Sequence, residues 1–290
     1  MRTNFLLVVL AVMAAGLSVK AEPPAATQPA TATAPMTAQE IAQEKVVVAD
    51  IQKLGGKVQR DGEAADGPVV EVYLAGTKVT DAGLEHLRGL NQLRRLTLMD
   101  TKVTDAGLEH LTGLNQLQDL CLAGDNLTNA GLEHLKGFNQ LQRLVLERTK
   151  LTDSGLEYLK EMNQLQTLNL SFTKVTDAGL KHLKGLNTLV YMDLDGTKVT
   201  DAGLGYLKEL NRLQTLALSY TEISDAGLEH LKGLNQLHTL LLTDTKVTDA
   251  GLEHCKGLNQ LQYLHLEGTK VTAEGIKRLQ EALPKCEIDH

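Results

Sequence analysis

The sequence predicts a right-handed α/β solenoid with a parallel β-sheet on its concave face and short helices on its convex face. The first observation behind this prediction is a repeat of 24 residues: the phrase T-K-V-T-D-A-G-L begins at residue 77 and recurs in one register, with substitutions, until residue 269. The second is that every repeat contains one segment with strand periodicity and one with helix signals. A stack of repeats explains this regularity, because each repeat then packs only against its neighbours.

Each repeat contains the same two elements. Residues 165–170, L-Q-T-L-N-L, alternate leucine with other residues and predict a strand with one buried face. The segment T-D-A-G-L-E-H-L-K-G predicts a helix of about two turns. Thr176 is the expected N-cap, Asp177 lies favourably against the helix dipole, and Gly185 is the expected left-handed residue after the last turn. Two turns are too few to be stable alone, so packing must hold the helix in place.

The stack is expected to curve into a horseshoe, because strands lie about 4.8 Å apart whereas packed helices need about 8–10 Å. The pattern L-x-x-L-x-L-x-x-T-x-V-T-D-A-G-L resembles the leucine-rich repeat family over residues 69–290. Its D-A-G-L segment is most similar to the helix-bearing repeats of secreted bacterial proteins and of the recognition domains of F-box proteins. This resemblance implies a leucine-rich repeat solenoid that recognises another macromolecule. Thr replaces the family's usual loop Asn, which leaves a ladder of loop hydrogen bonds open.

The N-terminal region differs from the repeats in composition. Residues 1–21 are identified as a signal peptide, because Arg2 precedes an apolar run that ends near the small-residue pattern Val19-Lys20-Ala21. That run is shorter than the roughly 20 residues that span a bilayer, although an uncleaved N-terminal anchor is the alternative. Residues 22–36 are rich in Pro, Ala and Thr and predict an extended linker.

The remaining boundaries follow from the repeat register. Residues 37–76 are expected to form an N-terminal cap, with a helix that opens at Thr37 and ends at Gly55-Gly56, followed by a strand at 69–74. Eight full repeats occupy 77–268, and 269–290 hold a truncated ninth repeat and a C-terminal cap. We expect no transmembrane segment once the signal has been cleaved, and an exported protein in the periplasm, on the cell surface or secreted.

Composition excludes several classes of function. The net charge is -7, from 29 Lys and Arg against 36 Asp and Glu, so a nucleic-acid partner is not expected. Aromatic residues make up 3% of the chain and Trp is absent, which disfavours large stacking sites. Three cysteines cannot form a disulfide scaffold. No P-loop or dinucleotide motif is present, so no cofactor is predicted.

The repeats differ from one another mainly at two strand positions that are expected to face solvent. The residue before the last strand leucine is different in all eight repeats: Thr97, Cys121, Val145, Asn169, Asp193, Ala217, Leu241 and His265. Two residues earlier the chain has Arg95, Asp119, Arg143, Thr167, Tyr191, Thr215, Thr239 and Tyr263. Drift of exposed positions would also produce such variation, but the exposed helix surface keeps Glu-His-Leu-Lys in repeat after repeat. This contrast favours a binding surface on the concave face.

Candidate binding residues gather in three places on that face. Tyr191, Asp193 and Asp195 alternate along one strand and point the same way, so they could hold a hydrated cation, a sugar or a basic peptide, or could form a solvated polar surface. A similar trio lies near the C-terminus: Tyr263, His265 and Glu267. Across three strands Arg95 and Arg143 flank Asp119, which predicts a weak surface charge ladder. The candidate set is Arg95, Asp119, Arg143, Asn169, Tyr191, Asp193, Asp195, Tyr263, His265 and Glu267.

Several features that suggest chemistry are better explained by the repeat itself. Six histidines occupy one helix position but converge on no common point, so no metal site is predicted: His86, His110, His134, His182, His230 and His254. Cys121 has no neighbouring base, and the Asp193 and Asp195 pair is expected to lie on an open surface where nothing separates their pKa values. A Cys255–Cys286 disulfide is left open.

These observations predict non-catalytic recognition of a protein partner through the concave sheet. Two alternatives remain: a structural or spacer protein of the envelope, and a carbohydrate-binding surface. The oligomeric state is not predicted, because the short C-terminal cap leaves edge-to-edge pairing open.

Overall fold

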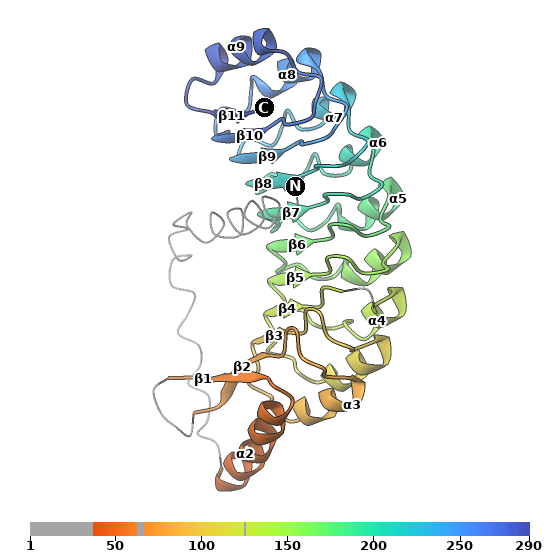
Figure 1. Cartoon of the computed structure of the whole chain (residues 1–290), viewed down its shortest axis with the longest axis vertical. Coiled ribbons are helices and arrows are strands. Elements are labelled where there is room, and N and C mark those ends of the chain that lie inside the picture. Colours follow the sequence, from red (N-terminus) through yellow and green to blue (C-terminus); the bar gives the residue numbers. More distant parts are fainter. Residues whose placement is uncertain (1–36, 63–66, 125) are drawn as a thin grey trace. The chain divides into compact units, whose positions relative to one another are not determined.

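Strands and helical segments alternate along the chain because the hydrophobic spacing in each repeat changes from two residues to helical spacing. The structure is a computed structural model that describes residues 37–62, 67–124 and 126–290. The predicted signal peptide and linker lie outside the described residues. The fold class is confirmed: eleven strands form one open sheet in chain order, and short helices line its other side (Figure 1).

The sheet contains one antiparallel pair and is otherwise parallel. Strand β1 (Lys57–Arg60) pairs antiparallel with β2 (Val69–Tyr73), and the sequence analysis did not predict β1, whose four residues K-V-Q-R carry little hydrophobic signal. The later strands are β3 (Arg95–Thr97), β4 (Asp119–Cys121), β5 (Arg143–Val145), β6 (Thr167–Asn169), β7 (Tyr191–Asp193), β8 (Thr215–Ala217), β9 (Thr239–Leu241), β10 (Tyr263–His265) and β11 (Glu287–Asp289). From β3 to β11 each strand has three residues, fewer than the six-residue pattern suggests.

The helical side of the stack is less regular. The helices are α2 (Ala38–Lys53), α3 (Asp81–Leu84), α4 (Asn129–Glu133), α5 (Asp177–Leu180), α6 (Asp201–Leu204), α7 (Asp225–Glu229), α8 (Asp249–Cys255) and α9 (Ala273–Ala282). Segments of 3-10 helix are η1 (Glu85–Leu87), η2 (Asp105–Leu111), η3 (Asp153–Leu159) and η4 (Lys181–Leu183). The predicted two-turn helix is therefore a short α or 3-10 segment, which tertiary packing must hold in place.

One continuous core runs through the stack from Ile51 to Cys286. The middle residue of each strand points into it: Leu96, Leu120, Leu144, Leu168, Met192, Leu216, Leu240 and Leu264 are all buried. The helix leucines, such as Leu180 and Leu183 in one repeat, cover the same core from the other side. Because each repeat contributes the same apolar positions, the core has no centre and extends with the number of repeats.

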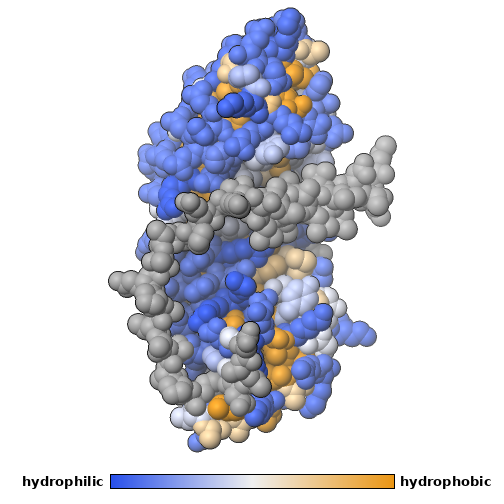
Figure 2. Space-filling view, turned by 90° about the vertical axis from the view of Figure 1, so that its left-hand side faces the viewer, coloured by the Kyte–Doolittle hydropathy of each residue, from blue (hydrophilic) through white to orange (hydrophobic). Residues whose placement is uncertain are grey.

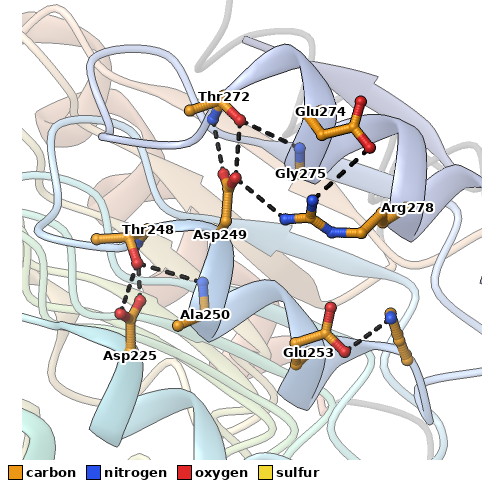
Figure 3. A network of polar contacts seen from close by, with 10 residues as sticks. Asp225, Thr248, Asp249, Ala250, Glu253, Thr272, Glu274, Gly275 and Arg278 are labelled. Atoms are coloured by element: carbon orange, nitrogen blue, oxygen red, sulfur yellow. Dashed lines mark hydrogen bonds and ion pairs between the residues drawn. The ribbon is translucent and has the colours of Figure 1, made fainter.

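A ladder of polar contacts joins neighbouring repeats where each helical segment begins, and Figure 3 shows its C-terminal part. The carboxylate of Asp225 accepts hydrogen bonds from the backbone nitrogen and the hydroxyl of Thr248, both at 2.7 Å. Asp249 accepts the same pair from Thr272, and these bonds lower the pKa of Asp249. The equivalent pairs are Asp81–Thr104, Asp105–Thr128, Asn129–Thr152, Asp153–Thr176, Asp177–Thr200 and Asp201–Ser224.

This ladder explains the repeated D-A-G-L motif better than the helix dipole does. A Cβ atom at Gly131 would lie 2.5 Å from Oδ1 of Asp105, so the carboxylate of the preceding repeat occupies the space of a side chain there. In some repeats the threonine that donates to the previous repeat also caps its own helical segment; Thr176 accepts from the nitrogen of Ala178, as predicted, and Thr128, Thr248 and Thr272 cap their segments in the same way. Aspartate, threonine and glycine thus act together across the boundary between repeats.

One local expectation was wrong. Gly185 does not adopt a positive φ, although Gly89, Gly113 and Gly137 do at the equivalent position. In its repeat the last turn continues in right-handed conformation through Lys184, so no left-handed residue is needed to end it. The question of a loop ladder, which the sequence leaves open, is answered for the described loop threonines: their hydroxyls donate within their own repeat, as Thr173 Oγ1 does to the carbonyl of Leu170 at 2.6 Å.

Ala38–His290 forms one unit of the chain. Within the described residues, no helix combines the length and the apolar character that crossing a membrane requires.

Candidate interaction surface

The side of the sheet that faces away from the main core carries two rows of side chains, which we call the sheet face. The register between neighbouring parallel strands never shifts from β3 to β10, so equivalent residues of successive repeats lie side by side. The first row runs from Arg95 to Tyr263 and the second from Thr97 to His265, as the repeat alignment predicts. Figure 2 shows this side of the molecule, on which hydrophilic residues predominate where the surface is visible.

The second row is more buried than the sequence analysis expects. Val145 is 1% exposed, and Cys121, Asn169, Ala217 and Leu241 are buried as well. Strands of a sheet lie only about 4.8 Å apart, so small and apolar side chains in one row cover one another. Cys121, Ala123 and Val145 form an apolar cluster separate from the main core, with Met99 packed against it.

A third feature of this side, absent from the sequence analysis, is the residue that ends the turn after each strand, which we call the turn row. All of its described members have positive φ: Gly76, Asp100, Gly124, Arg148, Phe172, Gly196, Tyr220, Asp244 and Gly268. For a residue with a Cβ atom this conformation costs about 1–2 kcal/mol. Phe172 and Tyr220 adopt this unfavourable conformation although their side chains are bulky, and they are 37% and 42% exposed. The alternation of glycine with other residues at one repeat position is the signal that could have identified this row.

The N-terminal half of the sheet face, from β2 to β5, contains charges that pair with one another. Arg143 Nη1 donates to Asp119 Oδ1 at 2.9 Å, as the charge ladder predicts. Arg95, however, contacts Glu71 at 3.4 Å instead of Asp119. In the turn that follows β5, Arg148 and Glu147 form a third pair at 3.5 Å. These pairs are partly exposed, so each contributes little to stability, but together they neutralise this half of the face.

At the centre of the sheet face, the structure brings together the trio that begins at Tyr191. Tyr191 Oη lies 3.3 Å from Asp193 Oδ2, and Asp193 Oδ1 accepts from the backbone nitrogen of Asp195 at 3.0 Å. Asp195 Oδ1 accepts from the backbone nitrogen of Ser219 in the next repeat at 2.6 Å. Asn169 lies beside Asp193 in the strand register but bonds to Ser171 of its own repeat.

The expectation that nothing shifts the pKa values of this trio was wrong. Burial raises the pKa of Asp193 to about 6, and burial together with the charge of Asp193 raises that of Asp195 to about 8. Burial also raises the pKa of Tyr191. The cause is the packing of oxygen-bearing side chains in adjacent rows, where desolvation disfavours the charged form. These shifts mark an electrostatic feature at the centre of the sheet face.

The C-terminal trio is more open and less connected. Tyr263 is 45% exposed. His265 Nδ1 lies 3.4 Å from Asp289 Oδ2 on β11 and forms no ion pair with Glu267 of its own trio. The charge partner of His265 therefore comes from the C-terminal edge strand, which the sequence analysis did not connect to this site.

The histidine column and the cysteines form no constellation within the described part of the chain. Three or more metal-ligating side chains gather nowhere among those residues. His86 Nδ1 lies 3.4 Å from Asp50 on α2, and the buried Nδ1 atom of His110 has no hydrogen-bond partner. Cys121, Cys255 and Cys286 are buried free thiols, and burial raises the pKa of each. The Cys255–Cys286 disulfide that the sequence leaves open is therefore not formed in this structure.

The chain matches known proteins in sequence and in fold. Residues 162–184 and 210–232 match the family model described as Leucine Rich repeat. Among solved structures, internalin C2 from Listeria monocytogenes is 22% identical, with a TM-score of 0.54 over 83% of this chain and 92% of that one. A plant peptide hormone receptor, RGFR1 in complex with RGF2, is 17% identical, with a TM-score of 0.53 over 80% of this chain and 39% of the receptor.

The comparison with curated proteins gives no match. The structural likenesses, both below 25% identity, establish the fold alone. Together with the family match and the unbroken repeat register, they show that the chain is a leucine-rich repeat protein.

Proposed function

We propose that this protein is a non-catalytic recognition module that binds a protein partner through the sheet face. The observation that carries the proposal is the divergence of the sheet face above a nearly constant row of leucines: the partly buried second row has eight different residues in eight repeats, and the more exposed first row varies among Arg, Asp, Thr and Tyr. Core positions are constrained by packing, whereas a face that differs from repeat to repeat provides one specific pattern of shape and charge.

The helical side provides an internal reference for this interpretation. One exposed position of the helical segment holds Glu in six of the eight repeats, as at Glu109 and Glu133, although it meets solvent as the first row of the sheet face does. If solvent-facing positions simply drifted, both sides would vary to a similar degree. The sheet side varies more, which supports binding there.

A macromolecular partner suits this surface better than a small molecule does. A row of side chains along eight parallel strands, each about 4.8 Å from the next, spans more than 30 Å and matches an extended or folded protein surface. RGFR1, which shares the fold, is a receptor in complex with RGF2, and we take from it only that such a sheet is compatible with a partner of this class.

Export is part of the proposal and depends on residues 1–21. We expect the N-terminus of the exported protein to begin at Glu22, after the small-residue pattern at 19–21. The intact mass of the protein recovered outside the cytoplasm tests this directly. An unprocessed mass would favour the N-terminal anchor instead.

The function is tested by affinity capture from the envelope and secreted fractions of the source cells. The bait variant changes Tyr191, Asp193, Tyr263 and His265 to Ala, and the control variant changes the exposed helix-side residues Glu109, Glu229 and Lys232 to Ala. Circular dichroism first establishes that both variants are folded. We expect one protein to be captured by the native chain and the control and to be lost with the bait variant.

The other outcomes separate the alternatives. Loss of a partner with the control variant and not with the bait variant would place binding on the helical side. Capture of a glycan in place of a protein, again lost with the bait variant, would favour the carbohydrate reading of the Tyr191 trio. Equal capture by all three forms, or none by any, would favour a structural or spacer role.

A further inference from the structure

Two aromatic residues stand on the turn row, where glycine is the residue that fits the backbone most readily. Phe172 has φ 56° and Tyr220 has φ 59°, and the repeat between them has Gly196 with φ 63°. The whole chain has six Tyr and three Phe, so the presence of two exposed rings at one strained position is notable. Positions of this kind cluster at functional sites.

The three residues form one continuous feature, which we call the aromatic ledge: Phe172, Gly196 and Tyr220. A Cβ atom at Gly196 would lie 2.6 Å from Cδ1 of Phe172, so the ring of Phe172 extends over the glycine toward the repeat of Tyr220. On the other side, the guanidinium of Arg148 lies 5.7 Å from the centre of the Phe172 ring. At one end of the ledge, Arg148 therefore makes a cation–π contact with Phe172. An arginine of a partner can make the same kind of contact with Tyr220 at the other end.

The charges around the Tyr220 end of the ledge are of one sign. The strands β7 to β10, each taken together with its turn-row residue as residues 191–196, 215–220, 239–244 and 263–268, contain Asp193, Asp195, Asp244 and Glu267 and no Lys or Arg; Lys198, Lys246 and Lys270 follow two residues beyond the turn row. None of these four carboxylates forms an ion pair with Lys or Arg among the described residues, whereas Glu71, Asp119 and Glu147 of the N-terminal half each do. Burial and the charges of Asp244, Asp195 and Glu267 raise the pKa of Tyr220, which shows that all three carboxylates lie within electrostatic range of its ring.

We propose that the aromatic ledge and the carboxylates of Asp244 and Glu267 bind an extended basic segment of the protein partner, with arginine side chains placed against Tyr220. This proposal rests on the proposed function and names the chemistry of the partner. A guanidinium stacks on an aromatic ring and pairs with a carboxylate at the same time, which an ammonium does less well. The negative surface complements the positive charge of the segment and guides its approach.

The dimensions fix the length of the segment. From the strand of Phe172 to that of Glu267 the sheet advances by four strand spacings of about 4.8 Å, which an extended peptide of about six residues crosses at roughly 3.3 Å per residue. Alternate side chains of such a peptide point to the sheet. Three cationic side chains therefore suffice to meet the carboxylates and the ring.

The test uses fluorescence anisotropy of the purified protein with three labelled dodecapeptides, in which serine alternates with arginine, with lysine or with glutamate. We expect saturable binding of the arginine peptide, weaker binding of the lysine peptide and none of the glutamate peptide. Asp244→Asn with Glu267→Gln should weaken the arginine peptide about threefold to tenfold, and Tyr220→Gly, which keeps the left-handed backbone, by a similar factor. The matched control, Asp100→Asn with Asp119→Asn, removes two carboxylates from the N-terminal half and should leave the affinity within about twofold.

Two results would overturn the proposal. Equal weakening by the C-terminal and the control variants would mean that the peptide responds to net charge and not to this site. Absence of saturable binding of the arginine peptide would exclude a basic segment. In either case capture of a partner by the native chain, lost with the variant of the Tyr191 and Tyr263 trios, would still support recognition by the sheet face, so the two proposals fail separately.

Discussion

The N-terminal and C-terminal halves of the sheet face are built on one backbone and have different chemistry. From β2 to β5 arginines and carboxylates form pairs beside an apolar cluster of Cys121, Ala123 and Val145. In β7 to β10 and the turn row that follows them, residues 191–196, 215–220, 239–244 and 263–268, carboxylates and tyrosines occur without Lys or Arg. The strand register and the leucine core are the same in both halves.

This difference shows that surface chemistry in the stack is independent of the scaffold. The core residues and the aspartate–threonine ladder repeat in both halves, so they set the fold and provide no discrimination. Discrimination between binding partners depends on the rows of the sheet face, because side chains there can differ from repeat to repeat while the strand register stays the same. Four predictions test how far the two halves can be separated, in order of the effect that we expect.

The largest effect is expected from a charge in the core of one half. Leu216→Asp and Leu120→Asp each place a carboxylate where a fully buried strand leucine stands, at a cost of about 4 kcal/mol or more. Because repeats interact only with their neighbours, hydrogen exchange should accelerate most around the substituted strand. Leu216→Asp should abolish binding of the arginine peptide, and Leu120→Asp should preserve most of it. Uniform loss of protection in both variants would refute the separation.

The second effect is a dependence of stability on pH that belongs to the centre of the C-terminal half. The folded-state pKa values of Asp193, about 6, and Asp195, about 8, lie above those of the unfolded chain. The folded state therefore binds protons more tightly, and these two groups make stability fall as pH rises from about 4 to about 8. The groups that act on them include each other, Tyr191 and Glu147.

Chemical denaturation at a series of pH values measures this effect. Asp193→Asn with Asp195→Asn should remove the fall in stability between pH 4 and 8 that the two carboxyl groups cause. Asp119→Asn in the N-terminal half should leave the fall as it is in the native protein. An unchanged profile in the double variant would show that the two carboxyl groups are not desolvated in solution.

The third effect should be equal in the two halves. Asp225→Ala and Asp105→Ala each remove two hydrogen bonds to the threonine of the next repeat, and we expect a loss of about 1–3 kcal/mol for both. Urea denaturation of the two variants gives the comparison. A difference of more than about 1 kcal/mol between them would mean that the scaffold is not equivalent in the two halves.

The smallest effect concerns the turn row. Tyr220→Gly and Arg148→Gly each relieve a positive φ, so each should leave the protein as stable as before or about 1 kcal/mol more stable. Thermal unfolding measures the change. Only Tyr220→Gly should weaken the arginine peptide. A loss of stability in both variants would mean that these side chains are kept for packing and not for binding.

The repeat register made much of this molecule predictable from sequence. The alternation around Leu168 placed the strand and its buried face, and comparison of repeats placed Asp193 beside Asn169 in one row. The contacts between repeats were not predictable in the same way. Asp177 bonds to Thr200, 23 residues away, and Arg95 pairs with Glu71 instead of Asp119. Such pairings depend on side-chain geometry, which repeat spacing does not determine.

The turn row was missed for a different reason. The strand pattern ends at its last leucine and makes no prediction for Phe172 and Tyr220, although Gly124, Gly196 and Gly268 at the same repeat position signal a left-handed backbone. The desolvation of Asp195 was missed because burial by neighbouring strands is a property of the assembled sheet.

The most direct test of the account is amide hydrogen exchange of the native protein with and without the arginine–serine dodecapeptide. We predict slower exchange in the turns and strands of 191–196, 215–220, 239–244 and 263–268, and unchanged exchange in 95–100 and 119–124. Equal protection of both groups, or protection of the N-terminal group alone, would contradict the claim that the two halves of the sheet face have different functions.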